Sequence, residues 1–131
     1  MQIVRGSEID FVPASHEDQD RPGVLKRVLA KRDDLIDGRV QMVNWASLPA
    51  GSSFQPHYHE DMQEVFIILS GIVEMTVDGR NSRLGAGDAI LIDPREVHAI
   101  KTLTQNDLEY IVFGITTDQG GQTIVVDEQS K

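Results

Sequence analysis

Short apolar stretches separated by turn residues follow one another along most of the chain. Residues 39–48 broadly alternate in polarity, whereas residues 65–69 are apolar throughout and fit a strand that is buried on both faces. Asp78-Gly79 is a typical two-residue hairpin turn. The pattern predicts strands at residues 39–48, 65–69, 72–77, 81–84, 89–92, 97–103, 108–116 and 123–126.

Residues 24–32 fit two patterns. Their apolar positions could line one face of a helix, yet Leu25, Arg27 and Leu29 would also lie on one side of a strand. The strand is favoured, because no helix-capping residue precedes the segment and the neighbouring elements are predicted strands. Residues 15–22 are wholly polar and end at Pro22-Gly23, which is typical of an exposed loop.

The choice of apolar residues supports a protein built mainly of strands. The chain has 13 Val and 12 Ile against 9 Leu and 7 Ala, and β-branched side chains pack well on pleated sheets. A length of 131 residues suits one domain. We therefore expect a single all-β domain over residues 1–131, either closed or made of two sheets.

Charge and composition narrow the range of partners. The formal net charge is −9, so nucleic acid and anionic membranes would be repelled and are not expected as partners. The absence of cysteine excludes disulfides, thiolate zinc sites and cysteine nucleophiles. No apolar run is long enough to span a bilayer, and residues 1–8 do not resemble a signal peptide. A cytoplasmic protein is the resulting expectation.

Three of the four histidines and one glutamate form the candidate site. His57 and His59 are two residues apart, so on an extended segment both side chains leave the same face. Glu64 begins the apolar strand 65–69, where a carboxylate is costly unless it is paired or bound to a metal. His98 lies on another predicted strand. Together these nitrogen and oxygen donors suit Fe, Mn, Ni, Zn or Cu.

The spacing of these residues resembles the first motif of the cupin superfamily, the small double-stranded β-helix barrels. That motif reads G-x5-H-x-H-x3-or-4-E-x6-G. The chain matches every fixed position, with Gly51, His57, His59, Glu64 and Gly71.

The second cupin motif, G-x5-P-x-G-x2-H-x3-N, is matched in part. Gly87 and His98 stand at the right spacing. Asp93 replaces the proline, Arg95 the second glycine and Thr102 the asparagine. These departures concern the turn before His98 rather than the histidine itself.

The resemblance implies a jelly-roll barrel over about residues 23–127, preceded by an N-terminal arm and acidic loop at residues 1–22. It further implies that four side chains bind one divalent transition metal inside the barrel, namely His57, His59, Glu64 and His98. The metal would be Fe, Mn, Ni, Zn or Cu, and the pattern does not choose among them. The fourth histidine, His16, lies in the acidic loop and is expected to play no part.

Strand alternation predicts which side chains lie near that metal. If the ligands point inward, so do Gln55, Phe66 and Ile68, and Met75 follows from the apolar side of the strand 72–77. These four residues are expected to line the pocket, where packing is their main role. Trp45, the single tryptophan, is expected in the core or in a dimer interface.

A six-coordinate metal with four protein ligands keeps two positions for a small molecule. Two chemistries follow: Lewis-acid catalysis in an isomerase or lyase, or reaction of substrate with dioxygen at a redox-active iron. The alternative is a cupin that binds or senses a small ligand without turnover. The resemblance also implies a homodimer, to which residues 1–12 could lend an edge strand.

Overall fold

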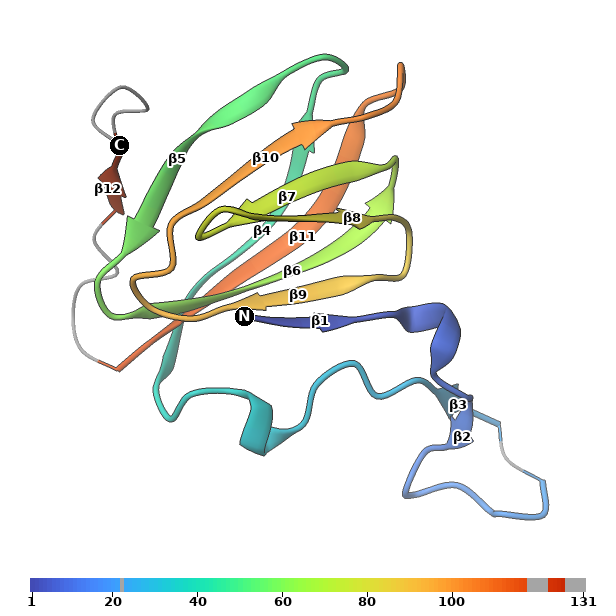
Figure 1. Cartoon of the computed structure of the whole chain (residues 1–131). Coiled ribbons are helices and arrows are strands. Elements are labelled where there is room, and N and C mark those ends of the chain that lie inside the picture. Colours follow the sequence, from blue (N-terminus) through green and yellow to red (C-terminus); the bar gives the residue numbers. More distant parts are fainter. Residues whose placement is uncertain (22, 118–122, 127–131) are drawn as a thin grey trace.

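Two five-stranded antiparallel sheets face each other and form a barrel (Figure 1). The structure is a computed structural model, and it describes residues 1–21, 23–117 and 123–126. The first sheet has the order β1 (Gln2–Val4), β9 (Ala89–Ile92), β6 (Met62–Ser70), β11 (Leu108–Thr116) and β4 (Arg39–Leu48). The second has the order β12 (Thr123–Val125), β5 (Ser53–His59), β10 (His98–Thr102), β7 (Val73–Val77) and β8 (Arg80–Leu84). This arrangement is the all-β, double-stranded β-helix expected from the sequence.

The main core fills the space between the two sheets. On β7 every second residue is buried, so Val73, Met75 and Val77 face inward while Glu74 and Thr76 are partly exposed. The core cluster consists of Phe66, Ile68, Val73, Met75, Val77, Leu84, Ile90, Ile92, Ile100, Leu108, Tyr110 and Val112.

The outer face of the first sheet has an apolar cluster of its own. Val65 on β6 packs there with Val4, Ala89 and Leu91. The segment before β4 covers this cluster with four partly buried side chains: Ile9, Leu29, Ala30 and Leu35. The continuous apolar run at residues 65–69 is explained by this second layer, because part of the strand is buried on both faces.

The N-terminal segment differs from the predicted arm. Strand β1 pairs with β9 of the same chain, Ile3 opposite Ile90, and so forms one edge of the first sheet. The sheet therefore begins at Gln2 rather than near residue 23. Strand β1 thus has a partner within its own chain. The exchange of an edge strand from residues 1–12 in a dimer stays a prediction.

The predicted strand at residues 24–32 was largely wrong. Only β3 (Leu25–Lys26) pairs, with β2 (Val12–Pro13), in a small hairpin that projects away from the barrel (Figure 1). The exposed acidic loop links these two strands. Single turns of 3₁₀ helix, η1 (Gly6–Glu8) and η2 (Arg32–Asp34), lie before β2 and after β3. Two paired residues are too few for a regular strand of the barrel. The alternation of residues 24–32 therefore did not indicate a strand.

Glycine at position 71 is required by the turn after β6. Its φ is +88°, and a Cβ there would lie 3.2 Å from Cα of Leu108. Any side chain would combine an unfavourable backbone conformation with crowding against the strand opposite. Asp78 and Gly79 also have positive φ, as a type I′ hairpin turn between β7 and β8 requires.

No helix among the described residues is long and apolar enough to cross a membrane.

Candidate metal centre

The four predicted ligands come together inside the barrel. His57 and His59 lie on β5 and His98 on the neighbouring β10, where His98 stands opposite His57 in the register. Glu64 lies on β6, in the facing sheet. His59, Glu64 and His98 are buried, and His57 is partly buried. Strands β5 and β10 of the second sheet and strand β6 of the first thus present four donors to a common point.

The distances fit a single metal ion. One donor atom from each residue lies within 4.8 Å of all the others. Nε2 of His59 and Nε2 of His98 each lie 2.9 Å from the same oxygen, Oε1 of Glu64. Around an octahedral ion with bonds of about 2.1 Å, neighbouring ligands are about 3.0 Å apart and opposite ones about 4.2 Å apart. The donor set and its spacing are therefore suited to a divalent transition metal.

Each histidine has an acceptor for its other ring nitrogen. Nδ1 of His57 lies 2.9 Å from the carbonyl oxygen of Gln55, and Nδ1 of His98 lies 3.0 Å from that of Glu96. Nδ1 of His59 lies 3.2 Å from Oγ1 of Thr123. An N–H donated from Nδ1 leaves the Nε2 lone pair for a metal, which is the usual arrangement around metal-binding histidines.

Electrostatics keep the carboxylate charged. Burial alone would raise the pKa of Glu64, but the hydrogen bonds from His59 and His98 and their electrostatic attraction outweigh it and lower the pKa to about 2. Burial also lowers the pKa of His57 below its usual value, which favours the neutral imidazole. A charged carboxylate and a neutral imidazole are the forms that bind metal.

The turn before His98 is held by a dense set of hydrogen bonds. The amide of Asp93 donates to Oε1 of Glu96 at 2.7 Å, and the amide of Arg95 donates to the carbonyl of His59 at 2.7 Å. The N-terminal ammonium of Met1 donates to the carboxylates of both Asp93 and Glu96. Arg95 has a φ of +70°, which accounts for the glycine in the family motif at this position.

Aromatic rings surround the imidazoles. The Phe54 ring centre lies 5.0 Å from that of His57, and the Phe66 ring centre lies 6.1 Å from that of His98. Tyr110 packs on Phe66 at 5.4 Å, and burial, together with the charge of Glu64, raises the pKa of its phenol. Aromatic side chains of the core thus pack next to the donors.

Gln55 does not face inward as the alternation predicted. Its side chain is exposed, and Phe54 packs against the core in its place. The register between β10 and β5 shifts between His98 and Ile100, so the alternation changes phase there. Ile68 and Met75, like Phe66, are fully buried members of the core cluster.

Sequence reasoning missed three residues that surround the site: Phe54, Tyr110 and Thr123. Tyr110 could have been found, because it alternates with the inward residues Leu108 and Val112 on β11. Thr123 carries no local signal, since its partner His59 is 64 residues away.

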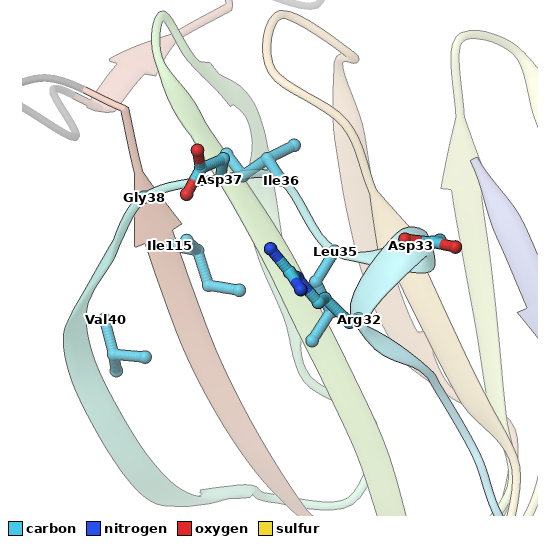
Figure 2. Close-up of a pocket in the computed structure, with 8 residues that line it drawn as sticks. All are labelled: Arg32, Asp33, Leu35, Ile36, Asp37, Gly38, Val40 and Ile115. Carbon is cyan, nitrogen blue, oxygen red and sulfur yellow. The ribbon is translucent and has the colours of Figure 1, made fainter.

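A hollow of about 550 Å³ lies elsewhere, on the outside of the first sheet (Figure 2). It is formed between residues 32–38 and the strands that carry Val40 and Ile115. None of the four clustered donors lines it, so it is separate from the candidate metal centre. His16 also lies outside the cluster.

The chain is similar to known proteins of one family. The Cupin domain family matches residues 44–114. The uncharacterized protein MJ1618 of Methanocaldococcus jannaschii is 31% identical over 70 residues, which cover 53% of this chain and 56% of that protein. The matched segment thus spans little more than half of that relative.

Two solved structures show the same fold. A predicted oxalate decarboxylase from Thermotoga maritima is 29% identical, with a TM-score of 0.57, and the match covers 86% of this chain and 97% of that one. The oxalate decarboxylase of Bacillus subtilis, described for its Mn(II) centers, is 19% identical with a TM-score of 0.54. That match covers 64% of this chain and 23% of the enzyme, so it supports the fold alone.

Proposed function

This chain belongs to the cupin family, and we propose that it is a metal-dependent enzyme that acts on a small carboxylic acid. The observation that carries the proposal is the cluster of His57, His59, Glu64 and His98, whose donor atoms lie within 4.8 Å of one another. These four residues would hold one divalent ion, either Fe, Mn, Ni, Zn or Cu. Such an ion supplies Lewis-acid chemistry by polarising substrate oxygens.

The charge of the site supports an anionic substrate. A divalent ion with one carboxylate ligand keeps a net charge of +1, and a carboxylate can bind at the positions that the protein leaves open. The buried polar and charged residues of the described chain are His59, Gln63, Glu64, His98 and Thr116. Since no lysine or arginine is among them, the metal itself would be the group that anchors the acid.

The reaction type is supported by similarity. The Thermotoga maritima neighbour, which matches most of this chain, is a predicted decarboxylase, and decarboxylases are lyases. We therefore favour a lyase over the dioxygenase and isomerase alternatives. The residues proposed to line the pocket are Phe66, Ile68 and Met75, together with Phe54 and Tyr110, which pack in or against the core beside the donors.

The proposal is tested by metal content and turnover measured together. The purified chain is stripped with a chelator, reloaded with each of the five metals in turn, dialysed and analysed for bound metal. Each form is then incubated with a panel of small carboxylic acids, with and without oxygen, and followed by NMR and CO₂ release. We expect close to one ion per chain and oxygen-independent turnover of at least one acid. Retention of less than half an equivalent of every metal, or an absence of turnover in every metal form, would overturn the proposal.

We also propose that the chain forms a homodimer through β4. On its outer side Val43 and Trp45 are 66% and 71% exposed, which is unusual for large apolar side chains. β4 is the edge strand of its sheet, and no other strand of the described residues pairs with its free edge. A second copy is the natural occupant, because two identical edges can pair antiparallel about a twofold axis and make one continuous sheet.

A further inference from the structure

His59 differs from the other two histidines in what holds its ring. The Nδ1 atoms of His57 and His98 face backbone carbonyls two residues earlier on their own chain segments. Nδ1 of His59 faces a side chain instead, the hydroxyl of Thr123 at 3.2 Å. Thr123 stands directly opposite His59 in the pairing of β12 with β5. A strand far along the sequence therefore contributes to the orientation of this imidazole.

The hydroxyl of Thr123 suits both states of the ring. It can donate to Nδ1 when the proton is on Nε2, and it can accept from Nδ1–H when Nε2 is used as a ligand. The first state matches the contact in which Nε2–H of His59 donates to Oε1 of Glu64 at 2.9 Å. In the second state the hydrogen bond to Thr123 fixes the tautomer and leaves the Nε2 lone pair for a metal held between His59 and Glu64.

We propose that Thr123 is a positioning residue of the metal centre and that β12 is thereby a functional part of the site. The inference rests on the proposed function, because it requires that His59 bind the metal. It deepens that function by adding a residue and a strand outside the segment that matches the family, residues 44–114.

Strand β12 is small enough for this hydrogen bond to matter. It has three residues, of which Thr123 and Val125 are exposed, and it lies at the edge of its sheet beside β5 (Figure 1). A further backbone bond joins the amide of Val126 to the carbonyl of Pro56 at 2.8 Å. Coupling to the metal works in both directions, because linkage is reciprocal: β12 orients His59, and a metal on His59 stabilises the docking of β12.

The test uses three variants of the full chain. Thr123→Val removes the hydroxyl at constant shape, Thr123→Ser restores it, and Thr76→Val is the matched control. Thr76 lies in the same sheet, and its hydroxyl donates to Asn81 at 2.7 Å and not to any of the four donors. Affinity for Mn²⁺ and Zn²⁺ is measured by competition with a chromophoric chelator, with circular dichroism of the metal-free proteins as the folding control.

We expect Thr123→Val to weaken metal binding about 10-fold or more. Thr123→Ser and Thr76→Val should bind like the parent. In the parent, metal should slow hydrogen exchange of the amides at residues 123–126, and in Thr123→Val it should slow them less. Parent-like affinity of Thr123→Val would overturn the inference, and so would equal losses in the valine and serine variants, which would indicate packing.

His59→Ala separates this inference from the proposed function. If the parent fails to bind metal, or if His59→Ala binds as tightly as the parent, the proposed metal centre is wrong. If His59→Ala loses affinity while Thr123→Val does not, the metal centre stands and only the role of Thr123 is wrong.

Discussion

Oε1 of Glu64 lies 2.9 Å from Nε2 of His98, across 34 residues of sequence and from one sheet to the other. The same oxygen meets Nε2 of His59 at 2.9 Å. Glu64 is the anionic member of this largely buried cluster, so it sets the charge that a divalent ion would meet there.

Replacement of Glu64 by glutamine should therefore weaken metal binding more than it disturbs the fold. Glu64→Gln keeps an oxygen donor and the shape of the side chain but removes the charge. We expect an affinity loss of at least about 10–100-fold, because changes in even the outer partners of metal ligands typically have effects of this size. Titration of the metal-free protein with Zn²⁺ checks this.

The control for that experiment is His16→Ala. His16 lies in the exposed acidic loop and is not a member of the cluster, so its removal should leave the affinity unchanged. His98→Ala should weaken binding at least as much as Glu64→Gln. A His16 variant that loses metal, or a Glu64 variant that binds like the parent, would place the metal elsewhere.

The metal-free protein should lose stability as the pH falls. The pKa of His57 is lowered by burial from 6.5, so the unfolded chain binds the extra proton first and stability begins to fall near that value. The pKa of Glu64 is about 2 in the folded state and 4.5 otherwise, so its contribution is complete above pH 4.5 and is lost as the pH falls towards 2. Between about pH 4.5 and pH 3 the loss from Glu64 amounts to roughly 2 kcal/mol.

Urea unfolding in the presence of a chelator, at several pH values from about 7 to 3, measures this dependence. In Glu64→Gln the fall below pH 4.5 should be smaller than in the parent, because the depressed carboxyl group is gone. Curves of equal steepness for the two proteins would show that Glu64 does not carry the effect.

Arg95→Gly should stabilise the protein. Arg95 has a φ of +70°, a conformation that costs most residues about 1–2 kcal/mol and glycine almost nothing. The flexibility of glycine in the unfolded chain offsets part of the gain, so we expect the free energy of unfolding to rise by about 0.5–1 kcal/mol. The ion pair with Glu60 is exposed and its loss should matter little.

Arg95→Val supplies the opposite control, since a β-branched residue is poorly suited to positive φ and should lower stability. Both variants are compared with the parent by denaturant unfolding. A glycine variant less stable than the parent would mean that the guanidinium stabilises the turn more than its backbone strain costs.

Dimer formation is tested by placing a charged residue on the outer side of β4 and measuring the mass in solution. The parent should show a solution mass of twice 14.6 kDa in light scattering at micromolar concentrations. Trp45→Glu should shift it towards the monomer, because the exposed indole would lie against its counterpart or close to it. Glu8→Gln should leave the mass unchanged, because Glu8 lies in η1, which follows β1 at the other edge of the same sheet. A parent that is monomeric throughout this range would contradict the interface.

The clustering of His57, His59 and Glu64 could be predicted from the sequence because their spacing is local. His57 and His59 share a face through the two-residue period of a strand, and Glu64 follows after a short bend. The glycines of the motifs also have a local cause, as Gly71 shows with its positive φ.

Features that depend on contacts between strands could not be predicted in the same way. The inward place of Phe54 instead of Gln55 arises from a register shift against β10, and Pro56 inside β5 is the local sign of that irregularity. Likewise, the pairing of β1 with β9 depends on where residue 90 lies in the sheet. Residues 24–32 show the reverse case, a strand-like pattern that finds no long partner.

An ion bound by Glu64 on one side and by His57, His59 and His98 on the other would act as a cross-link between the two sheets. The sheets could not separate without breaking its coordination, so dissociation of the metal and global unfolding would become one kinetic event. Metal should then slow unfolding far more than it speeds folding, provided the site assembles only after the sheets have met. The barrel would gain a clamp that works like a disulfide, in a chain that has no cysteine.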